Sequence, residues 1–250
     1  MYTVTSVTKT YGKGHGVVTA LNGVDAVIED GEWLAIQGPT GHGKSTLLQL
    51  LGGLDRPSSG RIELDGLDLA AARETRITRV RARSIGFIFQ TFNLIPTLSA
   101  LENTEMALVP LGIPAAERRA RATRALDRVG LAGRLSHLPS ELSGGQQQRV
   151  AISRALVKEP RVLLADEPTG NLDERTRDEI IGLLDELWRD RSLTMVMVTH
   201  DSAVARRAQS VAIMMDGRLS GGPRGDRGVV PPGQRPGPAV SPAADTGPAS

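Results

Sequence analysis

The chain has 250 residues, 40% of them hydrophobic and 23% charged, so it can bury the core of one large domain or of a domain with a subdomain. A formal net charge of +2 gives little attraction to nucleic acid, and we expect no nucleic-acid partner. The chain has no cysteine, which excludes disulfides and thiolate metal sites, and its apolar runs are far shorter than the ~20 residues of a membrane span.

The N-terminal region predicts an antiparallel β subdomain that leads into a core strand. Short β-rich runs at 3–8, 17–21, 24–28 and 33–37 alternate with glycine and charged turns. Tyr11 is a rare aromatic residue in a chain with 3% aromatics. Ahead of a nucleotide site it could stack on a base, and a tyrosine half-buried in a turn is the alternative.

The next stretch matches the phosphate-loop pattern G-x-x-x-x-G-K-[ST], between a strand-like run and an apolar helical start. The loop consists of Gly38, Pro39, Thr40, Gly41, His42, Gly43, Lys44 and Ser45. Its glycines let backbone N–H groups turn inward around a polyphosphate, and the positive end of the following helix points to the same place. Lys44 is expected to contact the β and γ phosphates, and the Ser45 hydroxyl to coordinate Mg²⁺.

Two alternatives accompany this loop. A glycine-rich turn between a strand and a helix can also bind nothing, although the spacing and flanks favour a nucleotide triphosphate site. The His42 side chain is expected to face solvent, and the alternative is an extra phosphate donor that makes binding pH-sensitive.

The middle of the chain predicts one further core strand and then a helical region. A strand at 61–66 and a short surface helix at 71–83 precede a buried strand run, 84–90. This run places Gln90 at a carboxyl end of the sheet, where α/β folds present ligand-binding groups. Helices are expected at 99–108 and 114–129, as a helical subdomain of about 91–140 inserted in the core. Apolar residues at its entrance are expected to join the core or to form a docking groove: Phe92, Leu94, Ile95 and Leu98.

After this insertion, a helix is expected at 147–158. Ser143 is a natural N-cap for it, and Gly144 and Gly145 leave backbone amides open as far as Gln146. The turn is therefore either a capped helix start or a second anion site.

Two further strand runs end in polar residues. The run 161–167 ends in Asp166 and Glu167, which are costly to bury unless a cation or a substrate uses them. After an amphipathic helix at 173–191, the strand run 194–199 places His200 at its carboxyl end. Beyond these elements the composition turns to glycine, proline, alanine and serine, which predicts a folded domain over 1–220 and a disordered tail over 221–250.

With these motifs in this order, residues 2–219 resemble the ATPase subunits of ABC transporters. The resemblance implies an α/β fold, with a P-loop NTPase core of mostly parallel strands, an antiparallel β subdomain and the helical insertion. It also implies that ATP and Mg²⁺ bind, that two copies form a dimer around ATP, and that an integral membrane permease is the partner. The subunit would then lie at the cytoplasmic face of the cell membrane as a peripheral protein.

The resemblance also implies roles for single residues in nucleotide binding. Tyr11 resembles the aromatic that stacks on adenine, and 38–45 resembles the Walker A loop, with Thr46 beside it. His42 departs from the family pattern, in which small residues are commoner at this position. The segment Ser143–Gln146 resembles the ABC signature, which in this family contacts the γ-phosphate of ATP held by the other copy.

In hydrolysis, Glu167 resembles the catalytic base of the family, and His200 the switch histidine that contacts the γ-phosphate. Asp166 resembles the Walker B acid that holds Mg²⁺, and Asp173 lies in the D-loop. Gln90 resembles the glutamine that contacts Mg²⁺ and relays the nucleotide state to the membrane subunit, and it joins Lys44 among the catalytic residues.

Three segments, 87–96, 100–103 and 167–173, resemble the subgroup that serves lipoprotein release, macrolide or peptide export, and cell division. We therefore expect an ATPase that powers a separate permease for export or extraction of a lipoprotein, peptide or drug-like substrate. An ATP-gated regulatory subunit of a cell-division-type complex is the alternative. A soluble ABC protein of DNA repair or translation is disfavoured, because the chain has one nucleotide domain, no long heptad insertion and no basic excess.

Overall fold

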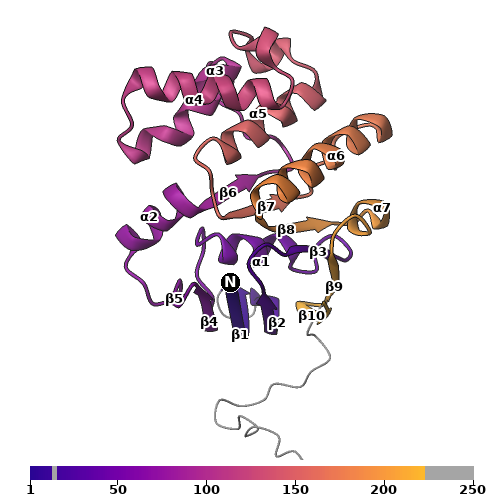
Figure 1. Ribbon diagram of the computed structural model, residues 1–250. Helices are drawn as coiled ribbons and strands as arrows, with labels where there is room; N and C mark the ends of the chain where they lie inside the picture. Colours follow the sequence, from indigo (N-terminus) through magenta and orange to yellow (C-terminus); the bar gives the residue numbers. More distant parts are fainter. Residues whose placement is uncertain (13–15, 223–250) are drawn as a thin grey trace, which may run out of the picture.

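The computed structural model describes residues 1–12 and 16–222, whose strands form two sheets (Figure 1). One is a four-stranded antiparallel sheet in the order β2-β1-β4-β5, and the other a six-stranded sheet in the order β10-β9-β3-β8-β7-β6. The strands are β1 (Tyr2–Tyr11), β2 (Val18–Ile28), β3 (Trp33–Gln37), β4 (Ser59–Leu64), β5 (Leu67–Asp68), β6 (Ile85–Ile88), β7 (Val162–Asp166), β8 (Thr194–Thr199), β9 (Ser210–Met215) and β10 (Arg218–Gly221). The predicted α/β class is confirmed.

The six-stranded sheet is parallel from β9 to β6, and only β10 runs antiparallel to its neighbour. Both faces of this sheet are covered. In β8, Met195 and Met197 join the core on the helical face, whereas Val196 and Val198 join the core shared with α1 and the antiparallel sheet. A strand buried on both faces is apolar at every position, which is why these runs were continuous in the sequence.

The antiparallel sheet differs from the prediction in one respect. Instead of separate strands at 17–21 and 24–28, the chain forms the single strand β2, with register shifts against β1. Gly23 lies within it at a φ of +66°, in the region that favours glycine. The glycine that suggested a turn therefore marks an irregularity inside one strand.

Helices cover the six-stranded sheet and form the predicted insertion between β6 and β7 (Figure 1). The helices are α1 (Lys44–Leu51), α2 (Glu74–Ser84), α3 (Ala100–Glu105), the 3-10 helix η2 (Met106–Leu111), α4 (Ala115–Arg128), the 3-10 turns η3 (Ala132–Arg134) and η4 (Pro139–Glu141), α5 (Gly144–Leu156), α6 (Glu174–Arg191) and α7 (Ser202–Ala205). The helix expected at 99–108 continues as a 3-10 segment after Glu105, with Pro110 inside that segment. Pro114 caps α4, where the sequence predicted a helix start.

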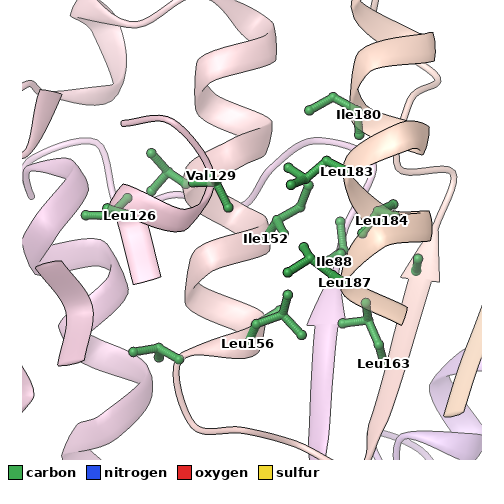
Figure 2. Packing of buried hydrophobic residues seen from close by; sticks show 14 of the residues in the cluster. Ile88, Leu126, Val129, Ile152, Leu156, Leu163, Ile180, Leu183, Leu184 and Leu187 are labelled. Atoms are coloured by element: carbon green, nitrogen blue, oxygen red, sulfur yellow. The ribbon is translucent and has the colours of Figure 1, made fainter. Parts of the chain in front are cut away.

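The helical insertion is joined to the sheet by a continuous apolar core (Figure 2). The stripe predicted on α6 is buried and faces Ile152 and Leu156 of α5; it consists of Ile180, Leu183, Leu184 and Leu187. Burying one such side chain contributes about 1.5–3 kcal/mol, so α5 and α6 hold the insertion firmly to β6 and β7. Within residues 1–12 and 16–222, no helix has both the length and the apolar character needed to span a bilayer.

The domain boundary near residue 220 stays a prediction. The tail expected over 221–250 lies outside the described residues, apart from its first two positions.

Candidate functional site

The predicted phosphate loop joins β3 to α1 and is wedged between two other strands. Gly43 precedes α1 with a φ of +98°, which strongly favours glycine. A Cβ on Gly43 would lie 2.2 Å from the Ala20 carbonyl oxygen of β2, and a Cβ on Gly38 would lie 2.2 Å from the Met214 carbonyl oxygen of β9. Only glycine fits at these two positions, so the backbone follows a path closed to other residues.

Lys44, the first residue of α1, is almost fully buried at the loop. Its Nζ donates to the carbonyl oxygens of Gly38 and Pro39, at 2.8 Å each. The Glu167 carboxylate is 3.9 Å away, beyond hydrogen-bonding distance. Lys44 is thus held mainly by neutral carbonyl groups, which leaves its positive charge available to an anion.

Two oxygen ligands meet at the end of β7. Ser45 Oγ donates to Asp166 Oδ1 at 2.9 Å. Burial raises the pKa of Asp166, and the neighbouring Glu167 charge adds to this rise, against the opposing effects of Ser45 and Lys44. A hydroxyl and a partly buried carboxylate side by side are the hard oxygen ligands that suit Mg²⁺, so these residues fit the expected ion.

Glu167 is held next to Asp166 and points to the end of β8. Its Oε2 lies 2.9 Å from His200 Nδ1, and its N–H donates to the Val198 carbonyl at 3.0 Å. The φ of Glu167 is +43°, a strained value for a residue with a side chain. Such strain is typical of functional sites, and here it orients the carboxylate toward Lys44 and His200.

Gln90 follows β6 and is exposed. Asn171 Nδ2 donates to the Gln90 carbonyl at 3.0 Å. A Cβ on Gly170 would lie 3.1 Å from Gln90 Nε2 and 3.4 Å from Glu167 Oε2, so Gly170 allows these two side chains to approach each other. The roles of Gly170 and Asn171 were not predictable from sequence, because a Pro-Thr-Gly-Asn run indicates only a turn.

Tyr11 ends β1 beside the phosphate-loop helix, and its ring is exposed. Its hydroxyl donates to Asp55 Oδ2 at 3.0 Å and also interacts with the Thr46 side chain of α1. Tyr11 therefore lies within a strand and presents its ring to the surface, unlike the alternative of a half-buried turn residue.

His42 faces solvent only in part, with 27% of its side chain exposed. Its Nδ1 accepts a hydrogen bond from the Asp216 N–H at 3.0 Å, and its carbonyl accepts from the Gly217 N–H at 3.2 Å. The His42 ring and backbone therefore connect the phosphate loop to the turn between β9 and β10 by two hydrogen bonds. The partner lies 174 positions away in the chain, so no local pattern could predict the contact.

The predicted signature turn, among the described residues, is not hydrogen-bonded to this cluster. Ser143 caps α5 by accepting from the Gln146 N–H at 3.3 Å, and Gln146 Oε1 accepts from the Ser143 N–H at 3.0 Å. A Cβ on Gly144 would lie 3.3 Å from Leu172 and one on Gly145 2.5 Å from Thr176, which places the turn beside the start of α6. Among residues 1–12 and 16–222, no hydrogen bond or ion pair joins Ser143–Gln146 to the phosphate loop.

Carboxyl ends of neighbouring parallel strands therefore bring together the phosphate loop, two acids, a histidine and a glutamine. The model of the family described as "ABC transporter" matches residues 21–170 of the chain. The chain belongs to the ABC transporter family. The predicted ATP-binding ABC ATPase is confirmed by this match.

Individual relatives agree with this ABC ATPase in sequence and structure. The lipoprotein-releasing system ATP-binding protein LolD of Geobacter metallireducens is 45% identical over 216 residues, covering 86% of the chain and 96% of LolD. The macrolide export ATP-binding/permease protein MacB 1/2 of Paracoccus denitrificans is 46% identical over 232 residues, covering 93% of the chain and 34% of that longer protein. A solved dimeric structure shows the ATP-binding cassette MJ0796 in a post-hydrolysis state bound to ADP and Pi. Its sequence is 42% identical to that of the present chain, and the two structures superpose with a TM-score of 0.83. The match covers 89% of the chain and 97% of the MJ0796 chain. The predicted subgroup is therefore confirmed.

Proposed function

We propose that the chain is the ATP-hydrolysing subunit of a membrane transporter, in which two copies enclose ATP and drive a separate integral membrane permease. The observation that carries this proposal is the division of the site within one chain. The phosphate loop, Asp166, Glu167 and His200 meet at neighbouring strand ends. The amide-rich turn at Ser143 instead packs beside Leu172 and Thr176 and, among the described residues, forms no hydrogen bond or ion pair with that cluster. A second copy would complete each site with that turn.

Binding rests on the phosphate loop and on two oxygen ligands. The N–H groups of the loop and Lys44 hold the phosphates of ATP, and the exposed Tyr11 ring stacks on the base. Ser45 and Asp166 would hold Mg²⁺, and Gln90, whose side chain approaches Glu167 over Gly170, would supply a further oxygen ligand. When bound, Mg²⁺ would supply charge neutralisation to the phosphates, and the Asp166 carboxylate, whose pKa is raised by burial, would gain a compensating charge.

Glu167 acts as the general base in this proposal, and it orients or deprotonates the attacking water. His200 lies 2.9 Å from its carboxylate, so it fixes the carboxylate and can also contact the γ-phosphate. Lys44 and the loop amides stabilise the charge that develops on the transferred phosphoryl group.

Glu167→Gln tests this role, because the amide keeps the size of the side chain and can still bond to His200. Turnover should fall by ~10²–10⁴-fold while ATP still binds. Glu63→Gln, in strand β4 of the antiparallel sheet, is the matched control and should hydrolyse ATP at the normal rate. Undiminished turnover in Glu167→Gln would reject the assignment.

The second copy would contribute Ser143 to the site. Ser143 is exposed, and its Oγ accepts from Gln146 N–H as an N-cap. Among the described residues, its own O–H has no acceptor, so this hydrogen is free for a phosphate oxygen. The MJ0796 structure, which is dimeric and bound to ADP and Pi, supports a dimer of this chain with bound nucleotide.

The permease would dock in an apolar groove beside Gln90. The cavity of about 280 Å³ is lined on its apolar side by Leu54, Ile85, Phe87, Phe89, Ala107 and Ala155. Arg154, which also lines it, donates to the carbonyl oxygens of Phe92 and Asn93, just after Gln90. A segment seated in this groove would therefore be mechanically connected to Gln90 and so to the nucleotide.

The proposed substrate class is based on the names of the relatives. Those named for lipoprotein release and macrolide export support export or extraction of a lipoprotein, peptide or drug-like molecule, by a complex with its ATPase at the cytoplasmic face. Co-purification with the permease, followed by a vectorial transport assay in vesicles, tests this. ATP-dependent movement of substrate supports the proposal, and nucleotide-controlled binding without movement would favour the regulatory alternative.

A further inference from the structure

The loop that follows α1 is tied to the end of β1. Ser58 Oγ accepts from the Thr10 N–H at 3.0 Å. Lys9 Nζ donates to the Arg56 carbonyl at 2.7 Å and to Asp55 Oδ1 at 2.8 Å. The last residues of β1 are thus held by the segment that leaves the phosphate-loop helix.

Asp55 is the centre of these contacts. Its carboxylate accepts from Lys9 Nζ, from the Arg56 N–H at 2.7 Å and from the Tyr11 hydroxyl at 3.0 Å. Partial burial acts to raise the pKa of Asp55, but these three hydrogen bonds outweigh it and hold the pKa below its usual value. Asp55 therefore stays ionised and remains a strong acceptor for the phenol.

The Tyr11 ring is fixed at its hydroxyl and covered on one face. Burial and the Asp55 carboxylate raise the pKa of Tyr11, so the phenol keeps its proton and donates to Asp55. Lys9 Nζ lies over the ring, 4.9 Å from its centroid. A planar ligand must therefore stack on the opposite face, and the tilt of that face is set by the bond to Asp55.

We propose that Asp55 is a positioning residue for the nucleotide, because it holds the Tyr11 ring in the orientation that stacks on the base. The inference rests on the proposed function, in which Tyr11 contacts the base. Asp55 lies in the loop directly after α1, so base and phosphates are recognised by one connected unit. The sequence indicated no role for Asp55, since a loop carboxylate four residues past a helix is ordinary.

The test compares ATP with tripolyphosphate, which carries the phosphates but no base, in calorimetric titrations of the whole chain. Asp55→Ala removes the acceptor, and Tyr11→Phe keeps the ring and removes the hydroxyl. Each variant should weaken ATP binding about fivefold, the factor expected for the loss of one hydrogen bond, and leave tripolyphosphate binding unchanged. The double variant should bind ATP no more weakly than Asp55→Ala alone, since both changes break the same contact.

Asp65→Ala is the matched control. Asp65 is a carboxylate of similar exposure that accepts from two cationic groups, the N-terminal ammonium and Arg161, so its loss should change neither affinity. Equal weakening of ATP and tripolyphosphate by Asp55→Ala would assign it a structural role and overturn the proposal. If Asp55→Ala does not fold, Tyr11→Phe decides, because it leaves the Lys9–Asp55 pair in place.

Tyr11→Ala separates this inference from the proposed function. If its ATP affinity equals that of the wild type, the base does not stack on Tyr11, and that part of the proposed function fails as well. If Tyr11→Ala weakens ATP binding but Asp55→Ala and Tyr11→Phe do not, the stacking stands and only the role of Asp55 is rejected.

Discussion

Two serines in this chain are helix N-caps. Comparing them separates the contribution of Ser143 to folding from its proposed contact with ATP held by the other copy. Ser143 and Ser99 both cap a helix in a capping box, and each Oγ accepts from an N–H at 3.3 Å. They differ in the fate of the hydroxyl hydrogen. Ser99 donates it to Glu102 at 2.7 Å, whereas Ser143 has no acceptor for it among the described residues.

Replacing either serine with alanine should cost about 1 kcal/mol of folding stability. In a chain of this size that lowers the Tm by roughly 2–4 °C, with Ser99→Ala the larger effect because it also loses the bond to Glu102. Only Ser143→Ala should affect the ATP-bound dimer. A hydrogen bond to a charged phosphate is worth about 1.5–3 kcal/mol, and the dimer would lose one at each of its two sites, so it should dissociate at least about a hundredfold more readily.

The dimer is best measured by sedimentation with ATP in a Glu167→Gln background, in which hydrolysis should be slow. Ser99→Ala in the same background controls for the loss of a cap. If the two alanine variants dimerise equally well with ATP, Ser143 acts only as a helix cap, and the proposed arrangement of two copies around ATP loses its main support.

Two further predictions concern folding. His42→Ala should lower the free energy of unfolding by ~0.5–1 kcal/mol, because the Asp216 N–H loses its acceptor, and urea denaturation would show no change if the contact contributes nothing. Burial lowers the pKa of Lys158 to about 8, below its value in the unfolded chain, so its contribution to stability should rise from pH 8 to about pH 10.5 and stay constant below pH 8. Lys158→Met should flatten this rise, which amounts to at most about 3 kcal/mol, and equal pH dependence in both proteins would refute the attribution.

The predictable part of the site depends on a topological rule. Apolar strand runs ended at the phosphate loop, at Gln90, at Asp166 and at His200. Parallel strands of one sheet have their carboxyl ends on the same edge, so residues distant in sequence were expected together. The Ser45–Asp166 and Glu167–His200 contacts have this origin.

Other contacts could not be predicted, because they depend on how separate layers pack. Tyr11 and Asp55 are 44 positions apart and meet only when β1 lies against the loop that follows α1. His42 contacts the β9–β10 turn because the phosphate loop is pressed against β9 near Met214. The prediction of two strands where β2 is continuous failed for a related reason. Gly23 does interrupt the regular strand geometry, but the residues on both sides of it pair with β1, so β2 is one strand.

The charges of the site explain why a bound nucleotide can couple to motion. Lys44 is buried against neutral carbonyl groups, and burial opposes the charge of Asp166, so the fold itself leaves one cation and one anion poorly compensated. A phosphate and a divalent cation satisfy both groups, and the γ-phosphate lies between this cluster and the Ser143 turn of the second copy in the proposed function. In this proposed arrangement, cleavage would remove the one group that both copies contact. The free energy available to separate the two copies would then be set by the contacts that Lys44, His200 and Ser143 make to the γ-phosphate, because a ligand shifts an equilibrium only by its different affinity for the two states.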